Sequence, residues 1–468
     1  MKEININGAV MKCYPLTAAQ RMHFYTIKFS PPQVLCIGTG VYVKQELDFN
    51  KLKEAIYKAY QMFETMRLRF IEDEEGNVYQ YISPFEEREI HINDFSSWKE
   101  EDVYKELSRR TSIPFERNNS PMNLVEIVKM PGGYNGIYSK IDHMTMDSSS
   151  IIGFSKTVIE IYCALVYNTP MPKPMASYIN QLEKDLAYED NSPAKQKDEQ
   201  FWMEEISRSE PMYTDFAGQG RLLTQRRENN NPDQRWAMVT SKSPEASISV
   251  FHLDEYSSVR LMKFCELNHV TMSSLLMMGM RTVLSKFNDN EKDVSVKCNV
   301  SRRGTLSEKN SGGTRIHFFP LRTVMEPDMT FMDGIKLIEA EQNKIFRHAN
   351  YDPIELTRKR AQYWKIQPGS SYESISLTYQ PLTLKGYAGK MPDIDYKSYW
   401  YTNGVAAQPL YLTVMHRPED NGMNFNFEYR SDAVTQHEME FFYYYLCRVL
   451  FRGIENHDRT IGEILELI

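Results

Sequence analysis

The stretch from Lys140 to Ser148 limits the fold most, because a strand pattern ends there and a helical pattern begins. Upstream, the side chains alternate up to His143, which places its imidazole at the last inward position of the expected strand. Downstream, Asp147 stands where a helix N-cap belongs, ahead of an apolar helical run over 151–166. This spacing suits acid/base chemistry, although the same two residues could simply end a strand and cap a helix.

Length and composition exclude several classes of protein. With 468 residues the chain is too long for one ordinary core, so two or three lobes are expected. A net charge of −7 argues against a nucleic-acid partner. The short basic groups, such as Arg302–Arg303, are expected to lie in solvated loops. The 6 cysteines show no metal-ligand or redox spacing, so neither a disulfide nor a metal site is predicted.

The ends and the apolar runs of the chain bear on its location. The N-terminal residues contain no apolar signal core, and no run approaches the ~20 apolar residues that a membrane span needs. The sequence therefore predicts a soluble, cytoplasmic protein with no membrane partner.

Strand and helix patterns are mixed in both halves without the strict alternation of a parallel-sheet enzyme, which predicts an α+β fold. Two strand patterns flank Pro131–Gly133 and predict a hairpin that leads the chain to His143. We expect a first lobe over 1–175, crossover helices and a loose linker over 176–246, and a second lobe over 247–468.

Six segments carry a more specific pattern. They are, in chain order, Thr17–Tyr25, Glu64–Phe70, Asp142–Ser148, Asp198–Trp202, Gly313–Arg322 and Tyr351–Glu355. In order and approximate spacing they resemble the motifs of the condensation domains of nonribosomal peptide synthetases, within the chloramphenicol-acetyltransferase-like superfamily. The third segment occupies the place of the family's hallmark His-His-x-x-x-Asp-Gly motif.

The resemblance implies two acetyltransferase-like lobes in a V-shaped pseudo-dimer, with the hallmark histidine midway along a central tunnel. It also implies acyl transfer without a permanently bound cofactor. Carrier proteins acting in trans would present an acyl or aminoacyl donor as a phosphopantetheine thioester. A small-molecule amine or alcohol would accept it, forming an amide or an ester in natural-product biosynthesis.

Site residues carry over by position. His143 would be the catalytic histidine, acting as a general base or positioning the nucleophile and stabilising the tetrahedral intermediate. Asp147 would be structural and would pair with Arg67, because a buried carboxylate needs a partner.

Three positions depart from the family pattern. Asp142 replaces the first hallmark histidine and is expected to support the site from the opposite strand face. Ser148 replaces the glycine and could narrow the tunnel, donate to an oxyanion or, as we expect, cap the helix. His317 stands where the family usually has asparagine and is a candidate for the tunnel wall or its surroundings.

Two other functions stay open. An O- or N-acyltransferase that uses acyl-CoA would share the phosphopantetheine donor, and a basic patch able to hold the nucleotide phosphates would favour it. A non-catalytic condensation-like module that recruits other proteins would fit the two departures in the hallmark motif. Retention of His-x-x-x-Asp favours an enzyme.

Overall fold

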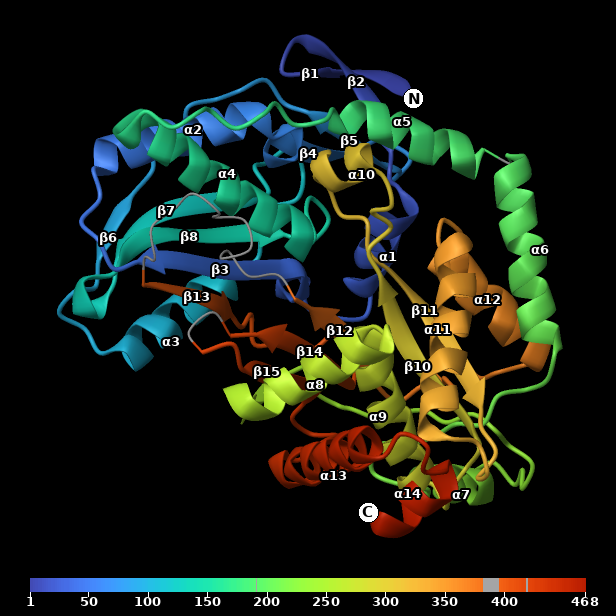
Figure 1. The fold of residues 1–468 in the computed structure, drawn as a ribbon. Helices are drawn as coiled ribbons and strands as arrows, with labels where there is room; N and C mark the ends of the chain where they lie inside the picture. Colours follow the sequence, from blue (N-terminus) through green and yellow to red (C-terminus); the bar gives the residue numbers. More distant parts are fainter. Residues whose placement is uncertain (191, 382–394, 418–419) are drawn as a thin grey trace. The chain divides into compact units, whose positions relative to one another are not determined.

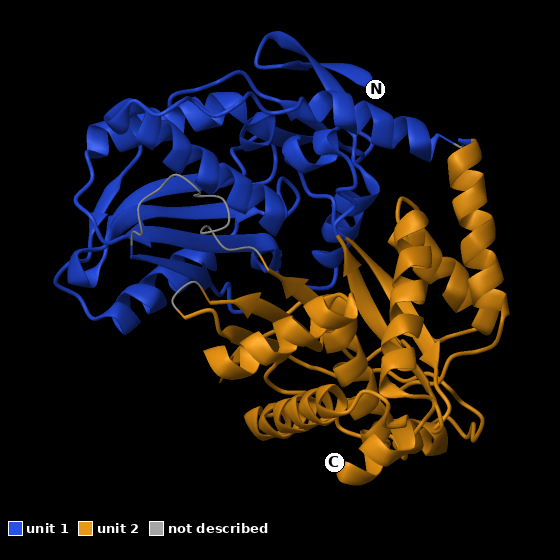
Figure 2. Cartoon of the chain, in the orientation of Figure 1, with its two compact units in different colours: residues 1–192, 301–316, 382–405 blue, residues 193–300, 317–381, 406–468 orange. Residues whose placement is uncertain are grey.

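The computed structural model describes residues 1–190, 192–381, 395–417 and 420–468 (Figure 1). Two compact units divide the chain (Figure 2). The first contains residues 1–192, 301–316 and 382–405, and the second contains residues 193–300, 317–381 and 406–468. Several mixed sheets with helices against them confirm the α+β prediction.

The first unit contains the N-terminal elements and two later ones. They are β1 (Lys2–Ile6), β2 (Ala9–Pro15), α1 (Ala18–Thr26), η1 (Pro32–Leu35), β3 (Cys36–Val43), α2 (Phe49–Met62), η2 (Glu64–Arg67), β4 (Leu68–Glu72), β5 (Val78–Ile82), β6 (Ile92–Asp94), α3 (Glu100–Thr111), β7 (Asn123–Lys129), η3 (Pro131–Gly133), β8 (Asn135–Asp142), α4 (Ser148–Tyr167), α5 (Tyr178–Glu189), α10 (Leu306–Asn310) and β13 (Tyr396–Tyr401).

The second unit contains the remaining elements. They are α6 (Pro193–Ser207), α7 (Gly220–Glu228), β9 (Ala246–Leu253), α8 (Glu255–Asn268), α9 (Met272–Phe287), β10 (Asp293–Val300), β11 (His317–Val324), α11 (Phe331–Arg347), α12 (Pro353–Trp364), β12 (Ser376–Gln380), β14 (Leu410–His416), β15 (Met423–Arg430), α13 (Gln436–Glu455) and α14 (Ile461–Leu467).

Strand β8 lies at the centre of a five-stranded sheet with the order β13-β3-β8-β7-β6. It pairs antiparallel with β3 and with β7, and the β7–β8 pairing confirms the predicted hairpin. Helices α2 and α4 cover one face of this sheet and α3 covers the other (Figure 1). A buried central strand is a rigid support, so the bend that follows β8 starts from a fixed point.

Helix α4 carries the apolar run seen in the sequence. Its inward residues pack with α2 and β8 in one core cluster that includes Ile56, Ile141 and Phe154. By length and hydropathy alone this helix could cross a membrane, which the sequence analysis did not anticipate, but 56% of the stretch is buried. We conclude that α4 is a core helix.

Two segments from the second half of the chain belong to the first unit. Residues 301–316 lie there, and β13 pairs antiparallel with β3 at the edge of its sheet. The bounds therefore differ from the predicted lobe over 247–468, and the predicted crossover over 176–246 is divided between the units. The physical reason is that an edge strand can pair with any strand of matching register, whatever their separation in sequence.

The second unit is built on a six-stranded sheet with the order β11-β10-β12-β14-β15-β9. Neighbouring strands β10, β12 and β14 run parallel, and the other pairs are antiparallel. The methionine-rich α9 is almost wholly buried in the core of this unit, so its apolar stripe serves packing.

Candidate active site

His143 lies on the five-residue bend between the end of β8 and the start of α4. Its backbone N–H donates to the Leu35 carbonyl at 2.7 Å. The backbone N–H and Oγ1 of Thr145 both donate to the Asp142 carbonyl, at 2.9 and 2.8 Å. These bonds hold the bend at both ends, so the position of the His143 backbone is well determined.

The His143 ring is half-buried and stacks on the ring of His23, with centroids 4.0 Å apart and an interplanar angle of 29°. Burial lowers the pKa of His143, although a bond to its own backbone and the charges of Asp147 and Asp142 oppose that effect. The imidazole is therefore neutral near pH 7 and can accept a proton.

The lowered pKa of His143 sets the expected pH dependence. A general base works only while it is unprotonated, so activity should be lost as the pH falls through the folded-state pKa of the ring. Because burial places that pKa below the ordinary histidine value, activity should persist below about pH 6.5. The acidic limb of a kcat/KM profile measures this, and an acidic limb at or above pH 6.5 would contradict it.

Asp147 is fully buried and holds the start of α4. Its Oδ1 accepts from the Ser150 N–H at 3.0 Å, which confirms Asp147 as the N-cap. Each carboxylate oxygen also lies 2.9 Å from Nη2 of Arg303, and Oδ2 accepts from the Arg315 N–H at 3.0 Å. The carboxylate is thus neutralised and hydrogen-bonded on every side, as a buried charge requires.

The predicted pairing of Asp147 with Arg67 is wrong. Arg67 Nη1 donates to the Ser83 carbonyl at 3.0 Å, and the Ser83 N–H donates back to the Arg67 carbonyl at 2.9 Å. The Arg67 guanidinium is therefore engaged with the end of β5. Arg303 takes its place because the segment 301–316 returns to the first unit, which no local pattern reveals.

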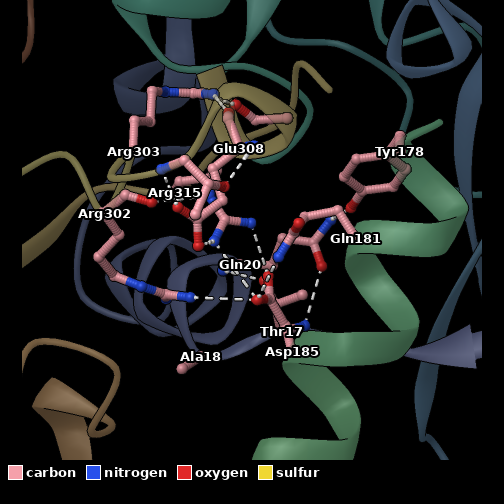
Figure 3. A network of polar contacts seen from close by, with 12 residues as sticks. Thr17, Ala18, Gln20, Tyr178, Gln181, Asp185, Arg302, Arg303, Glu308 and Arg315 are labelled. Atoms are coloured by element: carbon pink, nitrogen blue, oxygen red, sulfur yellow. Dashed lines mark hydrogen bonds and ion pairs between the residues drawn. The ribbon is translucent and has the colours of Figure 1, made fainter. Parts of the chain in front are cut away.

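The arginines of this segment form a buried network (Figure 3). The guanidinium of Arg315 lies 2.7 Å from Asp185 on α5, and that of Arg302 lies 3.6 Å from the same carboxylate. The side chains of Arg302 and Arg303 are only 6% and 7% exposed, and burial lowers the pKa of Arg302 to about 10. The expectation that Arg302–Arg303 lie in a solvated loop is wrong, because carboxylates in the same unit compensate their charge.

The other predicted site residues have structural surroundings. Asp142 is buried, accepts from the Met144 N–H at 2.9 Å and lies 2.6 Å from Nη2 of Arg117. Ser148 is the first residue of α4, but Asp147 provides the side-chain cap, so the expectation that Ser148 caps the helix is wrong.

His317, in the second unit, is fully buried, and its Nδ1 lies 2.9 Å from the Ala349 carbonyl. A ring buried in this way does not suit the wall of an open passage. Its place in the site, which was predicted from the family pattern, is therefore not supported by its surroundings.

Two residues of α1 were missed by the sequence analysis, although they stand in the first motif. Gln20 and His23 are three residues apart, so both lie on one face of the helix. Gln20 closes a capping box with Thr17, and its Nε2 donates to the Met144 carbonyl at 3.2 Å. This helical spacing, together with the polar character of both residues in a buried motif, was the available signal.

Replacing Gln20 with leucine should lower the free energy of unfolding by about 1–3 kcal/mol, because the buried Met144 carbonyl and Thr17 N–H lose their partner. Thermal unfolding measures this change. The exposed Gln61 on α2 is the matched control, and Gln61→Leu should change stability little. Equal stability of the two variants would contradict a bracing role for Gln20.

Within the described ranges, no group of three His, Cys, Asp or Glu side chains is placed to hold a metal ion. The chemistry available at the bend therefore comes from the imidazole of His143 and from the hydrogen-bond donors around it.

Comparisons with known proteins identify the family. The condensation-domain family model matches residues 10–467. One plipastatin synthase polypeptide of Bacillus subtilis (strain 168) is 24% identical over 96% of this chain, and surfactin synthase subunit 1 of the same organism is 23% identical over 96%. The chain spans only 17% and 12% of the lengths of these two proteins.

Solved structures show the same fold. The first condensation domain of the calcium-dependent antibiotic synthetase, in complex with a substrate analogue, matches with a TM-score of 0.78 and 17% identity, over 97% of this chain and 98% of that one. The starter condensation domain of rhizomide synthetase, in complex with C8-CoA, matches with a TM-score of 0.77 and 18% identity, over 96% of this chain and 97% of that one. With a family model that matches almost every residue, the chain belongs to the condensation-domain family.

Proposed function

We propose that the chain transfers an acyl or aminoacyl group from a phosphopantetheine thioester to a small-molecule amine or alcohol. Condensation domains catalyse amide-bond formation, so the class of enzyme is an acyltransferase. The observation that carries the proposal is the half-buried His143 ring, whose lowered pKa keeps it neutral on a braced bend. A neutral imidazole held in place is the group that acyl transfer requires as a base.

In the proposed reaction, the acceptor nitrogen or oxygen attacks the thioester carbonyl while the acceptor proton passes to His143. The tetrahedral intermediate then collapses, the carbon–sulfur bond breaks, and the thiolate takes the proton back from the imidazolium. Asp147 and Arg303 do not exchange protons in this scheme. They keep the bend in the geometry that the transfer needs.

A carrier protein acting in trans is the proposed donor partner, and we place the reaction in the cytoplasm. The support is that the curated relatives are synthetase polypeptides of which this chain spans only a small part. A second candidate donor is acyl-CoA, because the starter condensation domain that shares the fold is a complex with C8-CoA. Both donors present the same phosphopantetheine thioester, so the proposed chemistry is common to them.

The purified chain should be incubated with acyl-loaded carrier protein or with acyl-CoA, in each case with a panel of amines and alcohols. Mass spectrometry should detect an amide or ester product with the carrier-bound donor. Product from acyl-CoA alone would favour the second candidate. Carrier binding without product from any combination would contradict acyl transfer and would favour a recruitment module instead.

A further inference from the structure

The stack of His23 on His143 is a contact between two imidazoles, and the proposed reaction uses only one of them. His23 comes from α1, whereas His143 follows β8, so tertiary structure alone brings the rings together. His23 is buried, and its Nε2 lies 3.3 Å from Oγ1 of Thr314. A buried histidine in this position is either ordinary core or part of the site.

Both ends of the stack are tied to the bend. Gln20, on the same face of α1 as His23, donates to the Met144 carbonyl next to His143. On the other side, Thr314 stands between Gly313 and Arg315, whose backbone groups bond to Ser150 and Asp147. The segment that anchors Asp147 therefore also anchors His23.

The orientation of the His143 ring has no other visible support. A reacting histidine is usually oriented by a hydrogen bond at its second ring nitrogen. Here Nδ1 of His143 is buried and, among the described residues, has no hydrogen-bond partner apart from its own backbone. The flat face of His23, 4.0 Å away, is the contact that limits rotation of the ring.

The charges around the pair disfavour a proton on it. Asp142 and Asp147 are the nearest carboxylates, but Arg117 neutralises the first and Arg303 the second. Burial, the charge of a protonated His143 and the charge of Arg117, in that order, hold the pKa of His23 well below its ordinary value. When one proton enters the pair, His143 takes it and His23 stays neutral.

We propose that His23 is a positioning residue for His143, which orients the reacting imidazole by stacking on its face and keeps water from that face. This inference rests on the proposed acyl transfer for its purpose. It makes a claim about ring titration, however, that can be measured without any substrate.

The test is a titration of the histidine ring protons by nuclear magnetic resonance on the full chain. In the unaltered protein, the His143 signal should titrate below the ordinary histidine value, and His23 should stay neutral across the range in which His143 titrates. In His23→Ala, water gains access to the ring, so the His143 midpoint should move up by more than the error of the titration. An unchanged midpoint would overturn the proposal.

Two further variants separate stacking from hydrogen bonding. His23→Phe keeps a flat ring but loses the bond to Thr314, and it should leave the His143 midpoint nearly unchanged. His23→Gln can keep a bond to Thr314 but has no ring, and it should raise the midpoint as alanine does. The opposite order would overturn the stacking role, and this pair decides the question even if His23→Ala does not fold.

The exposed His437 on α13 provides the matched control, and His437→Ala should leave the His143 titration unchanged. A kcat/KM profile adds a functional measure, since the acidic limb should move with the ring midpoint in each His23 variant. If the ring titrations follow the expected pattern but no product forms with any donor, the positioning of His143 stands and the proposed acyl transfer fails.

Discussion

Replacing His143 with alanine is expected to abolish detectable product, a loss of about 10²–10⁴-fold in turnover, while the fold stays intact. The physical reason is that no other described group at the bend offers a neutral base, because Asp142 and Asp147 are already paired with arginines. Mass spectrometry of the product from acyl-loaded carrier protein or acyl-CoA measures the loss.

The matched control is His91→Ala, which removes an exposed histidine of the same unit and should leave turnover unchanged. The thermal midpoint of His143→Ala should stay close to that of the unaltered protein, because the bend is held by backbone bonds. If His143→Ala turned over substrate at the normal rate, the ring would have no part in the mechanism.

Replacing Arg303 with alanine is expected to destabilise the protein by about 3–5 kcal/mol and to abolish activity as well. Asp147 would remain fully buried with its charge no longer compensated, which is the costly way to break a buried ion pair. The start of α4 would then loosen and the bend with it. Thermal or denaturant unfolding, followed by the product assay, measures both effects.

Arg67→Ala provides the comparison that separates the observed pair from the predicted one. Arg67 bonds to the Ser83 carbonyl and not to Asp147, so its loss should cost about 1–2 kcal/mol and should leave Asp147 paired. A larger loss of stability in Arg67→Ala than in Arg303→Ala would refute the assignment of Arg303 as the partner of Asp147.

The local elements around the site were predictable because their signals are local. The hairpin of β7 and β8 follows from two alternating strand patterns around a Pro-Gly-Gly turn. The N-cap at Asp147 follows from a carboxylate placed just before an apolar helical run. Resemblance to motifs in the right order extended these signals to the α+β fold and to the family.

The sequence by itself determined the strand, the bend, the capped helix and the histidine between them, since each depends on neighbours within a few positions. Only the tertiary structure decided that Arg303 compensates Asp147, that His23 stacks on His143 and that β13 joins the sheet of β3. Those contacts join residues that lie far apart along the chain. Their energy comes from burial and charge compensation in the folded chain, and no periodic pattern along the sequence records it.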